Sequence, residues 1–171
     1  MFLKERCESE ELKVLKALNT RMDLPDKEKQ YYLNLQKGYE GEVMFDGYLR
    51  RLVIQSLIMN DLLLEQNHSH FQIDSLLSSQ RLSYLFEVKN FVGEYYFEGD
   101  KFKTDNGNEV KNPLLQLDRN ASLLRQFFNS NGIKIPIEPY LVFVNPEFTL
   151  YQAPLEGRII LPTNLNRFIE K

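Results

Sequence analysis

The sequence predicts one globular domain of the α/β or α+β class, and three stretches carry this prediction. Residues 71–90 alternate apolar and polar side chains on both sides of a short polar turn, as a β-hairpin does. Residues 140–144 are a continuous apolar run, which is typical of a strand buried on both faces. Asn112 and Pro113 mark a helix start, because asparagine caps helices well and proline suits the first helical position.

The composition allows a sizeable core and narrows the functional classes. Of the 171 residues, 43% are hydrophobic, and the net charge of −3 lacks the basic character of many nucleic-acid binders. This counts against a tight, non-specific duplex binder, but it allows an enzyme with a local basic groove. Cys7 is the only cysteine, so the chain forms no intramolecular disulfide and no zinc–cysteine cluster. There is no signal-peptide pattern and no apolar run of the ~20 residues that span a bilayer, so we expect a reduced, cytoplasmic protein without membrane segments.

Before the hairpin, the pattern predicts two helices and a strand. Residues 1–24 carry a helical apolar stripe with an acidic start at Ser9, and residues 23–26 form a turn. A second helix opens at Gly38 and continues to about Met59. Its expected buried stripe comprises Phe45, Leu49, Leu52, Val53 and Leu57. A strand then begins at Leu62, and residues 66–70 form a polar turn, where His68 and His70 lack a third ligand and are better explained as loop residues than as a metal site.

The register of the hairpin brings charged residues together. With Gln80 and Arg81 at the centre of the turn, Asp74 lies opposite Glu87, and Gln72 lies opposite Lys89. Leu76 faces Leu85 on the same side. The other face is mostly apolar and pairs Ile73 with Val88, Ser75 with Phe86, and Leu77 with Tyr84.

Two carboxylates directly opposite one another are destabilising unless their charge is neutralised, and a divalent cation is the usual remedy. Lys89 adds an ammonium group two residues from Glu87, on the same face of the strand. Two metal-binding carboxylates beside an ammonium group form a site that is suited to activating water and stabilising charge on a phosphate.

After the hairpin, residues 91–104 predict a second hairpin, whose aromatic side chains we expect to cover a sheet edge or core rather than to stack on bases. The helix from Asn112 runs to about Asn129. Gln116 in its first turn either points at the carboxylates or belongs to an exposed polar face with Arg119 and Asn120. Segments 148–151 and 158–161 are weaker strand candidates, and Thr163 is expected to cap a short final helix.

Glu42 lies three residues before Phe45 and therefore tends toward the buried face of its helix. Two interpretations stay open. A carboxylate near the start of a helix is favourable by itself, because that end of the helix dipole is positive. Alternatively, Glu42 points toward Asp74 and Glu87 and extends the site.

Four short motifs occur in a fixed order: Gly38-x-x-Gly41-Glu42, Gln72-Ile73-Asp74, Glu87-Val88-Lys89-Asn90, and Asn112-Pro113-x-x-Gln116. This ordered set resembles the NERD (nuclease-related) domain family of the PD-(D/E)XK restriction-endonuclease-like superfamily. The similarity covers roughly residues 36–145. Each motif alone is weak, whereas the ordered set on suitable secondary structure is considerably more specific.

The resemblance implies a restriction-endonuclease-like core, a mixed β-sheet flanked by helices with the active site at the hairpin. Asp74 and Glu87 would be the metal-binding carboxylates, and the main-chain carbonyl of Val88 would complete the metal shell. Lys89 would be the catalytic lysine. Glu42 would be the helix-borne acid and a further metal ligand, Gln116 the helix-borne glutamine, and Gly41 would allow a close approach of the helix. Residues 1–35 would then be an N-terminal helical extension and residues 36–171 the nuclease-like domain.

From site and resemblance together we expect a Mg²⁺- or Mn²⁺-dependent nuclease that hydrolyses phosphodiester bonds in DNA. The alternative is a catalytically silent module that binds nucleic acid or a protein partner through the same cleft. A third interpretation makes the charged residues a structural ion-pair cluster. A homodimer is a further expectation from the resemblance, because related nucleases often act as dimers.

Overall fold

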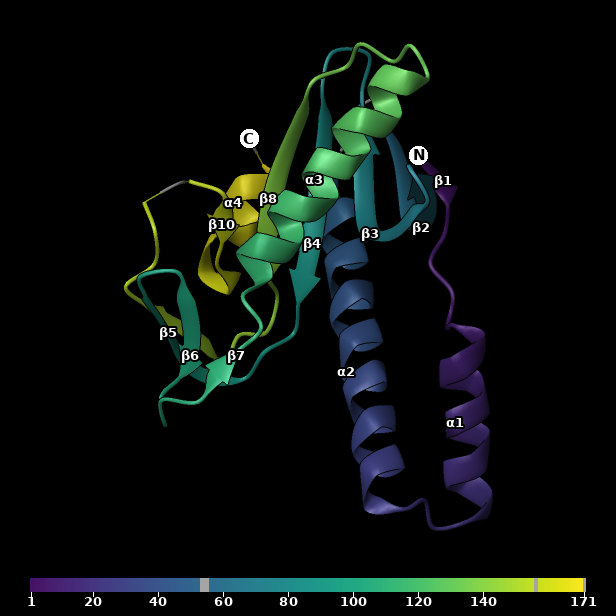
Figure 1. Ribbon diagram of the computed structural model, residues 1–171, viewed down its shortest axis with the longest axis vertical. Helices are drawn as coiled ribbons and strands as arrows, with labels where there is room; N and C mark the ends of the chain where they lie inside the picture. Colours follow the sequence, from purple (N-terminus) through teal and green to yellow (C-terminus); the bar gives the residue numbers. More distant parts are fainter. Residues whose placement is uncertain (53–55, 156, 171) are drawn as a thin grey trace.

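The computed structural model describes residues 1–52, 56–155 and 157–170, which fold around a mixed β-sheet. Its six strands run in the order β1-β2-β3-β4-β8-β10. They are β1 (Phe2–Lys4), β2 (Leu57–Gln66), β3 (Ser69–Ser78), β4 (Ser83–Lys89), β8 (Ile137–Phe143) and β10 (Ile159–Ile160). Strands β2, β3 and β4 are antiparallel, and β4 pairs in parallel with β8. The predicted mixed sheet flanked by helices is confirmed (Figure 1).

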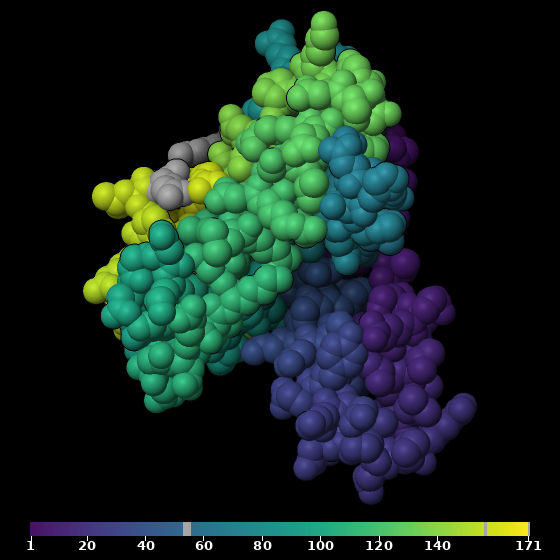
Figure 2. Space-filling view, viewed as in Figure 1, coloured from purple at the N-terminus to yellow at the C-terminus, as the bar shows by residue number. Residues whose placement is uncertain are grey.

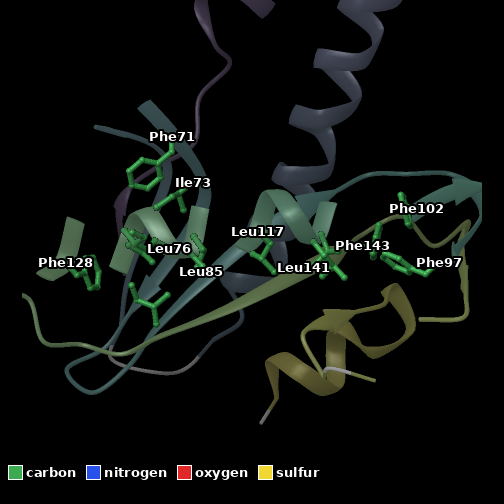
Figure 3. Packing of buried hydrophobic residues seen from close by; sticks show 14 of the residues in the cluster. Phe71, Ile73, Leu76, Leu85, Phe97, Phe102, Leu117, Phe128, Leu141 and Phe143 are labelled. Carbon is green, nitrogen blue, oxygen red and sulfur yellow. The ribbon is translucent and has the colours of Figure 1, made fainter. Parts of the chain in front are cut away.

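Helices cover both faces of this sheet. Helix α3 (Pro113–Ser130) packs on one face, where Leu117 and Leu124 meet Leu85 of β4 and the other apolar side chains of a large core (Figure 3). The C-terminal half of α2 (Asp26–Leu49) and α4 (Leu165–Ile169) cover the other face. Because both faces are covered, β8 buries consecutive apolar residues, as the run at residues 140–144 predicted.

A second, smaller sheet extends the core at one end. Its four strands run in the order β7-β6-β5-β9, which are β7 (Glu109–Val110), β6 (Lys101–Thr104), β5 (Gly93–Glu98) and β9 (Phe148–Tyr151). The hairpin predicted for residues 91–104 is β5–β6. Phe148 of this sheet stacks on Phe143 of β8 with ring centroids 3.9 Å apart, so aromatic packing joins the two sheets.

The N-terminal part of the chain forms a projecting helical arm. Helix α1 (Glu10–Arg21) packs against the first half of α2 through Leu12, Leu24 and Tyr32 (Figures 1 and 2). Ser9 caps α1, since its hydroxyl oxygen accepts the Leu12 N–H at 3.1 Å. We call α1 and residues 26–35 of α2 the arm. The predicted division after residue 35 falls inside α2, which continues without interruption into the body.

Three expectations about local structure are wrong. The second helix begins at Asp26 rather than Gly38 and ends at Leu49 rather than near Met59; Leu57 starts β2, and Val53 lies outside the described residues. Residues 2–4 form a strand rather than a helix, because they pair with the edge of β2, a contact that local patterns do not report. The final helix follows the 3₁₀ turn η1 (Pro162–Asn164), in which Thr163 lies without serving as the cap.

Within the described ranges, none of the helices combines the length and the apolar character needed to cross a membrane.

Candidate active site

The β3–β4 hairpin has the predicted register over its turn half. Ser79 begins the turn, with Gln80 and Arg81 at its centre, and the ladder pairs Leu76 with Leu85 and Leu77 with Tyr84. The ladder ends at the pair Ser75–Phe86. Asp74 and Glu87 come next, and these two described residues do not pair with each other in the β3–β4 ladder. The predicted pairing therefore stops one residue short of the carboxylates.

Where strands β3 and β4 separate, the side chain of Asp74 accepts a hydrogen bond that a main-chain carbonyl would accept in a regular ladder. Its Oδ2 accepts the main-chain N–H of Val88 at 2.8 Å, and the residue is 8% exposed. The pairing of β3 with β2 also skips this position, opposite Asp61, whose φ is 50°. Because of this irregularity, Ile73 belongs to the same core as Leu76, and the prediction that it shares a face with Val88 is wrong.

Glu87 is buried under helix α3. It is 2% exposed, its Oε1 accepts a hydrogen bond from Lys89 Nζ at 2.8 Å, and its Oε2 accepts one from Asn120 Nδ2 at 3.3 Å. Asn120 also donates to the carbonyl of Gln72 at 3.0 Å. A residue that the sequence assigned to an exposed polar face thus joins helix α3 to both strands of the hairpin.

Lys89 and Gln116 meet at the mouth of the site. Lys89 Nζ donates to Gln116 Oε1 at 3.4 Å, so the first turn of α3 does point Gln116 at the carboxylate cluster. Burial lowers the pKa of Lys89, but Glu87 and Asp74 raise it by more, and the pKa lies above its usual value. Lys89 is therefore a cation in this environment, which suits charge stabilisation rather than proton abstraction.

The two carboxylates destabilise each other in their charged forms. Burial raises the pKa of Asp74 well above its ordinary value, and the charges of Glu87 and Glu42 raise it further. Lys89 and the N–H of Val88 act in the opposite direction, but they do not offset the effect of burial. The Asp74 carboxyl group thus favours binding either a proton or another positive charge.

Glu42 reaches the site from the middle of α2, not from a helix start, so the interpretation of it as a helix-terminal acid is wrong. Its Oε2 accepts a hydrogen bond from Arg6 Nη1. The pKa of Glu42 is raised to about 7: burial and the negative charges of Asp61 and Asp46 raise it, whereas the positive charges of Arg6 and Lys89 lower it.

Asn90 fastens α2 to the end of β4. Its Nδ2 donates to the carbonyl of Lys37 at 2.7 Å, and its Oδ1 accepts from Asn145 Nδ2 at 2.8 Å. Gly41 faces this side chain so closely that a Cβ atom on Gly41 would lie 2.4 Å from Asn90 Cβ. This is the close approach expected of Gly41, and it sets Glu42 beside the hairpin.

These residues line one groove of about 890 Å³ between the arm and the body. All five predicted side chains border it: Glu42, Asp74, Glu87, Lys89 and Gln116. Val88 borders it as well, and Phe91 and Tyr95 form part of the wall on the side of the second sheet. The arm contributes Leu12 and Leu35 to the groove, and the next turn of α2 contributes Lys37 and Tyr39.

The donor set suits a small hard cation. Mg²⁺ commonly binds through one or two carboxylates and keeps several water ligands, and Asp74 and Glu87 offer two buried carboxylates whose mutual repulsion a cation would relieve. Among the described residues, no group of three or more His, Cys, Asp or Glu side chains is arranged to hold a metal ion. His68 and His70 are exposed beside Glu65, and neither of them lines this groove.

Sequence reasoning missed four polar residues around this site: Arg6, Asp46, Asp61 and Asn120. For Asp46 and Asn120 the sequence carries a usable signal of their position. Asp46 follows Glu42 by four residues and Asn120 follows Gln116 by four, which is the spacing of neighbours on one helix face. Arg6 and Asp61 had none, because they lie in segments that only the tertiary fold brings together.

Comparison with known proteins gives one match. A family model described as "Nuclease-related domain" matches residues 37–144, which is more than half of the chain. The matched region holds all five predicted side chains, whereas Arg6 and the arm precede it. No curated protein and no solved structure matches the chain.

Proposed function

Since the chain belongs to the nuclease-related domain (NERD) family, we propose that it is a metal-dependent nuclease that hydrolyses phosphodiester bonds, with DNA as its substrate. The observation that carries this proposal is the arrangement of Asp74, Glu87 and Lys89. Two buried carboxylates and one ammonium group line the same groove at the point where the hairpin strands separate.

Asp74 and Glu87, together with the main-chain carbonyl of Val88, would hold Mg²⁺ or Mn²⁺. The bound ion would supply positive charge for activating water and for stabilising a phosphate in its transition state. Val88 contributes in a second way, because its N–H holds Asp74 Oδ2 at 2.8 Å and thereby orients the carboxylate.

Lys89 is the catalytic cation of this proposal. Its ammonium group is held between Glu87 Oε1 and Gln116 Oε1, which leaves it directed into the groove. A charged lysine in a partly buried site donates hydrogen bonds to phosphate oxygens and to the attacking water. Gln116 orients the ammonium group through its carbonyl oxygen.

A cleavage assay tests the proposal directly. Plasmid, single-stranded and branched DNA would be incubated with Mg²⁺ or Mn²⁺ and the wild-type protein, Lys89→Ala or Lys101→Ala. Removing one charge-stabilising donor typically lowers kcat by about 10²- to 10³-fold, which is the loss expected for Lys89→Ala. Lys101 is an exposed lysine of strand β6 and serves as the matched control, so Lys101→Ala should cleave like the wild type.

Absence of cleavage on all substrates with both metals would contradict the proposal. Nucleic-acid binding that survives chelation and the change Glu87→Ala would instead identify the chain as a catalytically silent binding module.

A further inference from the structure

Arg6 lies between β1 and α1, before the region matched by the family model, and yet it is buried next to the active site. Its side chain is 2% exposed. It forms a bidentate pair with Asp46, from Nε to Oδ2 at 2.9 Å and from Nη2 to Oδ1 at 3.2 Å. Its Nη1 donates to Asp61 Oδ1 at 2.7 Å and to Glu42 Oε2.

The same guanidinium group holds the main chain of β3. Arg6 Nη2 donates to the carbonyl of Asp74 at 2.9 Å and to Ser75 Oγ at 2.9 Å. Asp74 is the position that the β2–β3 and β3–β4 ladders both leave unpaired. Arg6 therefore supplies the donor that a neighbouring strand would provide in a regular sheet, at the residue whose side chain enters the active site.

Glu42 is engaged by this arginine. A buried guanidinium group needs compensating carboxylates, and Glu42, Asp46 and Asp61 surround Arg6 in that role. Hydrogen bonding to Nη1 engages Oε2, one of the two oxygens of the Glu42 carboxylate, in the ion pair with Arg6.

We propose that Arg6 is a positioning residue of the active site: it holds the main chain at Asp74 and keeps Glu42 as its own counter-ion, so that the metal is held without Glu42. The metal part rests on the proposed nuclease function, whereas the main-chain part does not. The segment joining β1 to α1 is thus an integral part of the site, although it lies outside the matched domain.

Arg6→Lys is the informative substitution. It keeps the positive charge, but a single ammonium group cannot reproduce the planar fork that reaches Asp46, Asp61 and the Asp74 carbonyl at once. Arg50→Lys is the matched control, because Arg50 is exposed and pairs only with Glu5 among the ion pairs of the described residues. Leu49→Ala, which opens a cavity in the other core, controls for general loss of stability.

The first measurement is amide hydrogen exchange of the full-length, metal-free protein by NMR. The Val88 amide reports on Asp74, since it donates to Asp74 Oδ2. In Arg6→Lys we expect exchange at Val88 to accelerate at least tenfold relative to Leu85, which lies within the intact part of the ladder. In Arg50→Lys and Leu49→Ala the ratio of the two rates should not change. An unchanged ratio in Arg6→Lys, or an equal change in Leu49→Ala, would overturn the positioning role.

The second measurement is Mn²⁺ affinity, followed by isothermal titration calorimetry and by the EPR signal of the free ion. Loss of a residue that orients metal ligands typically weakens binding by about 10- to 100-fold, which is the expectation for Arg6→Lys. Glu42→Gln should bind Mn²⁺ like the wild type, while Asp74→Asn should not bind it. A loss in Glu42→Gln as large as that in Asp74→Asn would show that Glu42 is a ligand and would overturn that part of the proposal. If the wild type binds no Mn²⁺, the proposed metal-dependent function fails, and the exchange measurement still decides the role of Arg6.

Discussion

Replacing Gly41 with alanine tests whether α2 and the hairpin are packed as closely as the structure places them. The added Cβ would lie 2.4 Å from Asn90 Cβ and 3.0 Å from Asn90 Cγ, whereas real Cβ contacts stay above 3.0 Å. Asn90 has little freedom to move away, because it is held by the carbonyl of Lys37 at 2.7 Å and by Asn145 at 2.8 Å. The helix and the strand must therefore separate.

Two opposing effects set the magnitude for Gly41→Ala. Overpacking in a well-packed region costs about 1–3 kcal/mol. Alanine is better than glycine in a helix interior by about 1 kcal/mol. The first effect is expected to dominate, because the contact is with the near, rigid part of a side chain that is bonded at both ends. Gly47 lies on the same helix, and a Cβ atom there would meet no described atom within 4 Å. Gly47→Ala should therefore gain only the stability that comes from the better helix propensity of alanine.

Urea unfolding of both variants and the wild type gives the two free energies of unfolding. The expected order is Gly47→Ala, then wild type, then Gly41→Ala, with the two variants separated by the overpacking cost alone, about 1–3 kcal/mol. In a domain of this size that difference corresponds to roughly 2–12 °C in Tm. If Gly41→Ala were as stable as Gly47→Ala with the same m-value, the close approach of α2 to Asn90 would be wrong, and the placement of Glu42 with it.

Two further predictions concern charge at the site. Glu42 has a pKa of about 7 in the folded protein, compared with an ordinary value of 4.5, so the folded state holds its proton more tightly than the unfolded state does. As the pH rises from 4.5 to 7 the carboxyl group loses this proton, and the free energy of unfolding falls. At ~1.4 kcal/mol per pH unit, the wild type should lose up to about 3 kcal/mol relative to Glu42→Gln between pH 4.5 and 7.5 in metal-free buffer; parallel stability curves from urea titrations would contradict this. Asp74→Asn keeps an oxygen for the Val88 N–H but removes the buried charge, so it should raise the metal-free Tm at pH 7 and abolish the rise that Mg²⁺ causes in the wild type. A lower Tm for Asp74→Asn, with no effect of Mg²⁺ on the wild type, would favour a structural ion-pair cluster.

The raised pKa of Lys89 bears on how the proposed reaction would proceed. Glu87 and Asp74 keep the ammonium group protonated, so in the proposed reaction Lys89 would act through its charge and its hydrogen bonds. The two carboxylates would then have two roles, because they would attract the metal ion and they hold the lysine in its cationic form. Removing either carboxylate would change both.

Much of the fold followed from local patterns. Hydrophobic alternation over residues 71–90 predicted the hairpin and its register, because a shift by one residue would exchange its buried and exposed faces. Asn112 and Pro113 predicted the start of α3, and the structure shows the reason, since Asn112 Oδ1 accepts the Leu114 N–H at 2.9 Å. The start of α2 was misplaced because the glycines at 38 and 41 imitate a helix boundary, while packing against the sheet keeps α2 continuous.

By itself the sequence predicted a candidate site: Asp74, Glu87 and Lys89 on one hairpin, Gln116 on the next helix, and Glu42 on the preceding one. The structure places all five side chains at a single groove. These residues follow from local periodicity and motif order, which a chain carries along its length. Only the tertiary structure decided which groups touch. It ended the ladder at Ser75, brought Arg6 and Asp61 from distant segments to Glu42, and buried Asn120 against Glu87. Such contacts form where the partners of a buried charge offset the cost of burying it. These partners come from distant segments, so the hydrophobic periodicity of the sequence does not reveal them.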